Sequence, residues 1–141
     1  MNIDKVAILV KKTALESDKL ANPVLANYDL TVSQYKILKY LYAQDSRTAR
    51  VVDLERQYSM THPTTLGLLG YLEKKGFVVR IPNPDDARGK LVSLTEKADA
   101  MEKELDAVGE TLESNLTSRL TAREKAQLIR LLKKMLGLEQ S

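Results

Sequence analysis

The residues best suited to chemistry in this chain are small hydrogen-bonding side chains at the start of one predicted helix. They are Thr61, His62, Thr64 and Thr65. Threonine offers a hydroxyl and a methyl group, and histidine donates or accepts according to its tautomer. Such groups suit the base edges and phosphates of a DNA major groove, where helix N-terminal amides also favour phosphate. Two simpler interpretations stay open: Thr61 as a helix cap and His62 as an exposed surface residue.

Other kinds of site find little support in the composition. The 141 residues include one histidine and no cysteine, so one chain offers no multi-histidine zinc site, thiolate nucleophile or disulfide. The sequence contains no glycine-rich phosphate loop and no paired carboxylates in an apolar setting. We therefore expect no enzyme, no metal site and no cofactor. The longest early apolar run, residues 6–10, is too short to span a bilayer, which predicts a cytoplasmic protein with no membrane partner.

Charge is unevenly distributed along the chain. The formal net charge is +3, which permits an anionic partner without requiring one. Residues 96–118 contain two basic and seven acidic residues, a net charge of −5. A long anion such as DNA would avoid this segment, so a DNA-binding surface must lie elsewhere.

Hydrophobic spacing predicts a mainly helical chain. An amphipathic N-terminal helix is expected to end before Asn22, and a second helix to begin at Thr31, which has capping-box spacing with Gln34. A short helix then ends near Ser59, and another begins almost at once at Thr61. Two helices that meet across a tight turn are typical of the helix-turn-helix motif.

The period of the pattern changes after Gly76, a predicted helix stop. Residues 77–81 and 91–94 read as two short strands, and residues 82–86 as the turn between them. Together they predict an antiparallel hairpin with a long loop and short strands, which would form a wing beside the helix-turn-helix. A long helix capped by Thr95 follows, with apolar residues at alternating intervals of three and four.

Both ends of the chain carry apolar stripes that the central lobe does not need. Thr121 and Glu124 have capping-box spacing at the start of the last helix. A monomer could bury these stripes internally, but two copies that cover them across a two-fold axis explain them better. The residues assigned to this dimer interface are Ile3, Val6, Val10, Leu128, Leu131, Leu132 and Met135.

The wing sequence resembles that of the MarR family of multiple-antibiotic-resistance-type regulators. The run Asp86-Ala87-Arg88-Gly89-Lys90-Leu91-Val92-Ser93-Leu94-Thr95 is similar to the family pattern of Asp, any residue, Arg, and a strand ending in Leu-Thr. The match extends upstream over residues 72–80, and the helix order covers nearly the whole chain. Two positions depart from the pattern: Gly67, where these regulators often carry arginine, and Glu55, where a small residue is usual.

The resemblance implies a mainly α fold with a small β hairpin, in which a winged helix-turn-helix domain is flanked by N- and C-terminal dimerisation helices. Residues 1–141 would form a single MarR-like domain. Residues 31–95 would be its DNA-reading lobe, and residues 1–21 and 96–141 its linker and dimerisation helices.

The wing residues gain specific roles from the resemblance. Arg88 would enter the minor groove from the wing tip, and an arginine there suits a narrow groove with enhanced negative potential. Asp86 would hold the geometry of the wing, and Arg80 and Lys90 would add contacts to DNA. The alternative for the tip is a surface turn with a weak Asp86–Arg88 ion pair, worth about 0 to 1 kcal/mol. Glu55 is expected to point outward or to pair with a nearby arginine, Arg50 or Arg56.

These features predict a sequence-specific double-stranded DNA-binding transcription regulator, a repressor that acts as a homodimer on a pseudo-palindromic site. The resemblance also implies release by a small aromatic or phenolic effector, whose site the sequence does not place. Tyr28, Tyr35, Tyr40 and Tyr42 lie near the expected junction, although tyrosines at helical spacing are more often core. The alternative function is a winged-helix module that binds protein through the acidic 96–118 helix and does not bind DNA.

Overall fold

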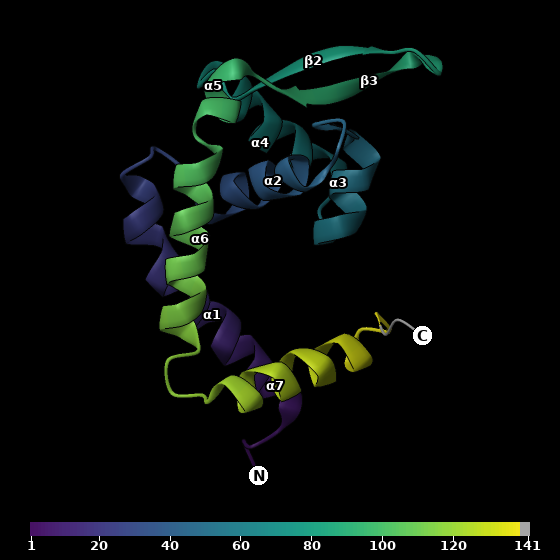
Figure 1. The fold of residues 1–141 in the computed structure, drawn as a ribbon. Coiled ribbons are helices and arrows are strands. Elements are labelled where there is room, and N and C mark those ends of the chain that lie inside the picture. Colours follow the sequence, from purple (N-terminus) through teal and green to yellow (C-terminus); the bar gives the residue numbers. More distant parts are fainter. Residues whose placement is uncertain (139–141) are drawn as a thin grey trace. The chain divides into compact units, whose positions relative to one another are not determined.

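The computed structural model describes residues 1–138, apart from the side chains of Ala87 and Arg88. Its elements in chain order are α1 (Val6–Ala26), α2 (Val32–Ala43), β1 (Thr48–Arg50), α3 (Val51–Tyr58), α4 (His62–Lys74), β2 (Val78–Asn83), β3 (Asp86–Leu94), α5 (Glu96–Ala100), α6 (Glu102–Leu116) and α7 (Ala122–Met135) (Figure 1). One compact unit combines residues 1–20 with the C-terminal part from residue 109, and residues 21–108 form the other. The predicted lobe, residues 31–95, lies inside the second unit. The helical fold with a small antiparallel sheet confirms the predicted fold class.

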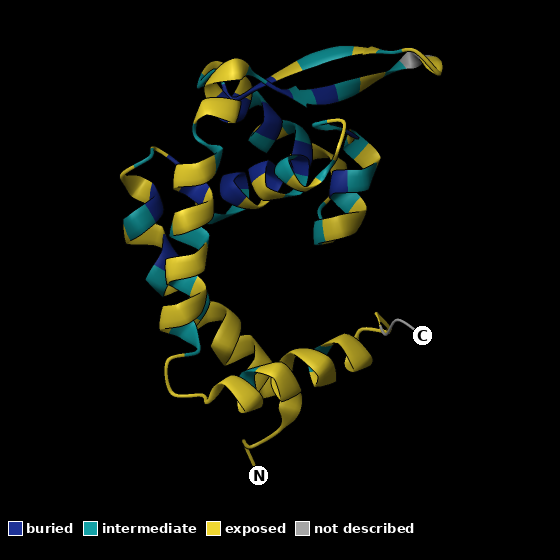
Figure 2. Ribbon diagram, viewed as in Figure 1, coloured by how far each residue is buried: buried dark blue, intermediate teal, exposed yellow. Residues whose placement is uncertain are grey.

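Helix α2 forms the centre of the second unit. The predicted capping box is present: Thr31 Oγ1 accepts from the Gln34 N–H at 3.2 Å, and Gln34 Oε1 accepts from the Thr31 N–H at 3.2 Å. Ile37, Leu38 and Leu41 are fully buried. Figure 2 shows the buried residues gathered on α2, α4 and the base of the sheet. This core holds α4 in place from its inner side.

The sheet has one strand more than the sequence predicted. Its order is β1-β3-β2, and both pairings are antiparallel. In β1, Thr48 pairs with Ser93 and Arg50 with Leu91. Three residues are too few to show an alternating pattern, and their pairing partner lies some forty positions further along the chain. The expected two-stranded hairpin is therefore part of a three-stranded sheet.

The wing turn is shorter than predicted. Strand β2 continues to Asn83 and β3 begins at Asp86, so the turn is confined to residues 84 and 85 rather than 82–86. Pro82 is accepted in β2 because β2 is an edge strand, where a missing N–H need not break a ladder hydrogen bond. Pro82 pairs with Lys90 while Asn83 pairs with Asp86, so the register shifts at this end of the wing. Bulges of this kind twist and bend a hairpin.

Helix α1 continues past the residue where it was expected to end. Pro23 lies inside it, although a proline has no N–H to donate to the carbonyl four residues earlier. The turn after Pro23 carries Leu25, which is fully buried, and the burial of this side chain offsets the lost hydrogen bond. The start also differs: Ile3 precedes the helix, which begins at Val6.

The long helix predicted after Thr95 is divided into α5 and α6 at Met101. Thr95 caps α5 as expected, with its Oγ1 accepting from the Ala98 N–H at 3.3 Å. The Ala98 carbonyl then accepts two hydrogen bonds, from the Met101 N–H at 3.1 Å and from the Tyr42 hydroxyl at 2.5 Å. The Tyr42 hydroxyl of α2 thus binds the Ala98 carbonyl, which in a continuous α-helix would accept from the N–H four residues later.

Helix α7 begins at the second predicted capping box, in which Thr121 and Glu124 exchange hydrogen bonds of 3.1 and 2.9 Å. It has no buried residue. Both α7 and the first part of α1 are exposed along their lengths in Figure 2. The exposed apolar residues include all the predicted dimer residues except Leu132, which is partly buried: Ile3, Val6, Val10, Leu128, Leu131 and Met135. No helix within residues 1–138 is both long and apolar enough to cross a membrane.

Candidate nucleic-acid interface

The start of α4 is built by a tight turn and a threonine cap. Ser59 adopts a left-handed backbone conformation, φ 51°, which ends α3 and reverses the chain. Thr61 Oγ1 accepts from the Thr64 N–H at 3.4 Å and also forms a 2.9 Å hydrogen bond with the Thr64 hydroxyl. Pro63 occupies the first turn, where its missing N–H costs nothing. Thr61 therefore caps the helix and remains exposed at its outer end.

Thr65 does not belong to the exposed surface, so its predicted contact with DNA is wrong. Its side chain is 0% exposed, and its hydroxyl donates to the Thr61 carbonyl at 3.0 Å. Thr65 precedes Leu69 by four residues and Leu72 by seven, and all three are buried on the same face of α4. This spacing was the signal in the sequence that could have placed Thr65 in the core.

His62 is exposed and is held by a carboxylate of α3. Its Nδ1 lies 2.6 Å from Glu55 Oε1. Glu55 thus pairs with His62 rather than with a predicted arginine, and Arg50 forms its ion pair with Asp53 at 2.8 Å. The Arg50 hydrogen bond holds the pKa of Asp53 below its usual value. Because an ionised carboxylate can only accept, Nδ1 of His62 carries the proton in this pair.

The outer face of α4 carries an exposed aromatic residue that sequence reasoning missed. Thr64, Gly67 and Tyr71 follow one another at intervals of three and four, and all three are exposed. The Tyr71 side chain is 59% exposed. A Cβ atom added at Gly67 would meet nothing within 4 Å. The spacing from Thr64 was the available signal for Tyr71, which lies on the face opposite the buried leucines.

The wing residues differ in how freely they present their charges. Arg80 Nε pairs with Glu73 of α4 at 2.9 Å, so this predicted DNA contact is engaged within the protein. Lys90 is exposed. A Cβ atom added at Gly89 would lie 3.4 Å from Asp86 Oδ2, so the Asp86 carboxylate lies close against the wing backbone. The Arg88 side chain lies outside the described residues.

A groove separates the wing from the start of α4. Its volume is about 560 Å³. Glu55 and His62 line one part of it, and Arg80 and Lys90 line another. The start of α4 and the wing therefore border one concave surface, and Arg50 brings its cationic or titratable nitrogen groups to four.

The tyrosines predicted near the junction link α2 and its neighbours to the α5–α6 segment. Three hydroxyls donate to that segment: Tyr28 to Glu104 Oε1 at 3.2 Å, Tyr35 to the Leu105 carbonyl at 2.8 Å, and Tyr42 to the Ala98 carbonyl at 2.5 Å. Tyr40 packs edge-on against Tyr58, with ring centroids 6.5 Å apart. Burial, followed by the nearby carboxylates of Glu102 and Asp99, raises the pKa of Tyr42 to about 12. These contacts give all four tyrosines a structural role.

A second groove lies beside these tyrosines. Its volume is about 450 Å³, and Tyr35, Tyr42 and Leu105 provide part of its lining. Two lysines, Lys39 and Lys103, and two acidic residues, Glu102 and Asp106, also line it. The Lys39 ammonium lies 5.4 Å from the centre of the Tyr35 ring, a cation–π distance.

The order of α2, α3, α4 and the β2–β3 wing defines a winged helix-turn-helix protein. The model of the MarR family matches residues 30–90. The chain is 37% identical over 129 residues to the multiple antibiotic resistance protein MarR of Escherichia coli (strain K12). The matched region covers 91% of this chain and 88% of that protein. The chain belongs to the MarR family, which confirms the resemblance seen in the sequence.

Two further relatives bear on function. The homoprotocatechuate degradative operon repressor of Escherichia coli is 26% identical, over 84% of this chain and 79% of the repressor. A crystal structure of a mutant Escherichia coli MarR complexed with operator DNA has a TM-score of 0.84 and 35% identity. It covers 95% of this chain and 95% of that chain.

Proposed function

We propose that this chain is a transcription repressor that binds a pseudo-palindromic operator as a homodimer. The observation that carries this proposal is the start of α4, where Thr61, His62 and Thr64 are exposed beside an antiparallel wing. A regulator with the same fold over 95% of this chain was crystallised with operator DNA, and another relative is named an operon repressor.

In this proposal α4 enters the major groove with its N-terminal end. Thr61, His62 and Thr64 reach base edges or phosphates, and Lys90 and Arg88 follow the neighbouring backbone and minor groove from the wing. Arg80 contributes by fixing the wing to Glu73, which is compatible with a further contact through its remaining nitrogens. The exposed apolar stripes of α1 and α7 are covered by a second copy, so two α4 helices meet successive major grooves.

The experiment that tests this proposal is selection of bound duplexes from a random-sequence pool, followed by a salt titration of the best site. We expect an inverted repeat with half-sites about one helical turn apart and an affinity that falls steeply as salt rises. If no duplex binds even at low salt, the proposal is wrong. That result would favour the alternative, a winged-helix module that binds a protein partner through the acidic residues 96–118.

The pair formed by His62 and Glu55 gives a specific prediction about base preference. With Nδ1–H donated to the carboxylate, the Nε2 of a neutral His62 is an acceptor and matches the amino groups of adenine or cytosine. In Glu55→Gln the amide N–H₂ can donate to Nδ1, which leaves Nε2–H as a donor toward guanine. We expect the preferred base at this position to shift by about fivefold in relative affinity, the worth of one hydrogen bond.

The measurement is the same selection carried out with both proteins at pH 8.5. His62→Ala is the control, since it should remove the preference at this position in either background. Identical base preferences for the parent and Glu55→Gln would contradict this role of Glu55.

We also propose that the groove beside Tyr35 and Tyr42 binds the small aromatic or phenolic effector. Its aromatic wall and the Lys39 ammonium suit an aromatic acid. Benzoate, used as the probe, should weaken operator binding by the parent, and Lys39→Met should lose this response. Lys36→Met, an exposed lysine of the same helix, is the matched control. An equal response in all three proteins would place the effector elsewhere.

A further inference from the structure

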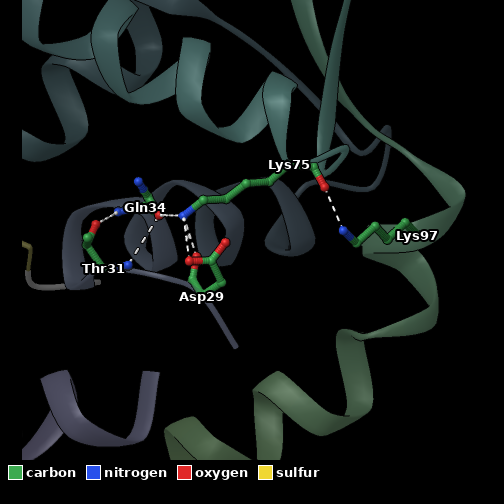
Figure 3. Close-up of polar contacts among 5 residues, drawn as sticks. All are labelled: Asp29, Thr31, Gln34, Lys75 and Lys97. Atoms are coloured by element: carbon green, nitrogen blue, oxygen red, sulfur yellow. Dashed lines mark hydrogen bonds and ion pairs between the residues drawn. The ribbon is translucent and has the colours of Figure 1, made fainter. Parts of the chain in front are cut away.

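Lys75, at the end of α4, has a side chain that faces the protein rather than solvent. Its side chain is 21% exposed. The ammonium donates to the Asp29 carbonyl and, at 2.9 Å, to Gln34 Oε1. The Asp29 carboxylate lies 3.7 Å from it, but this group is 86% exposed, so the ion pair itself adds little. Figure 3 shows the lysine reaching from the end of α4 to the corner before α2.

Both acceptors are themselves parts of defined backbone structures. Gln34 Oε1 also accepts from the Thr31 N–H, so the ammonium joins the capping box of α2. Asp29 has a left-handed backbone, φ 57°, which is uncommon for a residue other than glycine. The carbonyl that Lys75 binds is that of Asp29, and the left-handed conformation of this residue sets the direction in which the carbonyl points.

The backbone of Lys75 is fixed from the opposite direction. Its carbonyl accepts from the Lys97 ammonium of α5 at 2.6 Å, and Lys97 lies 4.7 Å from the centre of the Phe77 ring. Gly76 follows with φ 80° and ends the helix. The end of α4 is thus held through the Lys75 side chain to the α1–α2 corner and through the Lys75 carbonyl to α5 (Figure 3).

We infer that Lys75 is a positioning residue, which sets the direction of α4 toward DNA by tying its C-terminal end to the corner formed by residues 27–31. This inference rests on the proposed function, because the direction of α4 matters only if α4 reads a duplex. The corner joins α2 to α1, whose first part carries exposed apolar residues. A conformational change at residues 27–31 would therefore alter the direction of α4 through Lys75. Neither the corner nor Lys75 would need to contact DNA.

The neighbouring residue supplies a matched control. Lys74 is exposed on the outer face of α4, one position away from Lys75. Lys75→Met and Lys74→Met remove the same charge and keep a similar aliphatic chain. A lysine that contacts phosphate and one that positions the helix differ in the salt dependence of binding, since each lost phosphate contact lowers the slope of log K against log salt by about one.

We expect Lys75→Met to weaken binding to the selected site by about tenfold with an unchanged salt slope. Lys75→Arg should restore most of the affinity, because its guanidinium can still donate to both acceptors. A salt slope lowered by about one in Lys75→Met would show a phosphate contact and overturn the inference. Affinity equal to that of the parent would overturn it as well.

Amide hydrogen exchange of the full chain without DNA provides an independent readout. In Lys75→Met, protection should fall together at residues 28–34 and 70–77, with little change in α3. Unchanged protection at the corner would contradict the tie between the two segments. If the parent binds no duplex, the proposed function fails, and the exchange result still decides whether Lys75 joins the corner to α4.

Discussion

A Leu131→Asp variant is expected to be monomeric and to lose most of its DNA affinity. Leu131 lies in the exposed apolar stripe of α7, 46% exposed in the single chain. In the proposed dimer two such carboxylates would be desolvated close to the two-fold axis, and like charges there cost several kcal/mol. That cost corresponds to a dimer association constant lowered by about a hundredfold or more.

Ala126→Asp is the control for this prediction. It adds the same charge to an exposed position of the opposite face of α7 and should leave the oligomeric state unchanged. Sedimentation equilibrium gives the state of each protein, and titration of the selected duplex gives its affinity. A dimeric Leu131→Asp protein, or a parent that is monomeric at micromolar concentration, would show that this stripe is not the interface.

The second large effect is expected from two substitutions on opposite faces of α4. Leu69 is fully buried, and Leu69→Ala should lower the free energy of unfolding by about 2 to 5 kcal/mol. Tyr71 is 59% exposed, so Tyr71→Ala should change that free energy by no more than about 0.5 kcal/mol. We expect Tyr71→Ala instead to weaken duplex binding about fivefold, as the loss of one contact would.

Urea unfolding at a fixed protein concentration, with duplex titration of the folded protein, separates these outcomes. The fixed concentration matters because the unfolding of a dimer depends on it. A large loss of stability in Tyr71→Ala would mean that its ring packs against the protein. Unchanged duplex binding in Tyr71→Ala would remove this residue from the DNA-reading face.

Signals that are local in sequence predicted their elements well. The capping boxes at Thr31 and Thr121 each need two residues three positions apart, and both form. The helix stop at Gly76 depends on one residue with a positive φ, and Gly76 has it. These caps and stops could be predicted because their cause and their effect lie within one turn of chain. The family resemblance depends on one short run, Asp86 to Thr95, but it did not predict the extent of the wing turn or the third strand.

Features that depend on distant partners were missed. Strand β1 exists because Thr48–Arg50 finds β3, and its three residues carry no pattern of their own. The break at Met101 follows a hydrogen bond from Tyr42, which is 56 positions from Ala98. Pro23 should have ended α1 by local rules, but Leu25 gains burial against the rest of its unit. In each case a tertiary contact outweighed the local preference.

The candidate site shows the same division. Thr61, His62 and Thr64 lie exposed at the start of α4 as predicted, whereas Thr65 has a suitable hydroxyl but is buried, as its spacing from Leu69 indicates. The sequence predicts that Glu55 points outward or pairs with a nearby arginine, but the turn at Ser59 brings His62 to it instead. The residue types indicated which groups could bind DNA, and the helical spacing determined which of those side chains are exposed.

Gly67 has a consequence for how such a regulator can change its target. Its outer surface is empty, so a side chain introduced there requires no repacking of the protein, and replacing glycine inside a helix adds about 1 kcal/mol of helix stability. Most substitutions lower the stability of a protein. At position 67, however, a new side chain can add a contact with DNA and also stabilise the helix. In the proposed mode of DNA binding, position 67 is therefore a place where a new side chain could change operator preference while the scaffold stays intact.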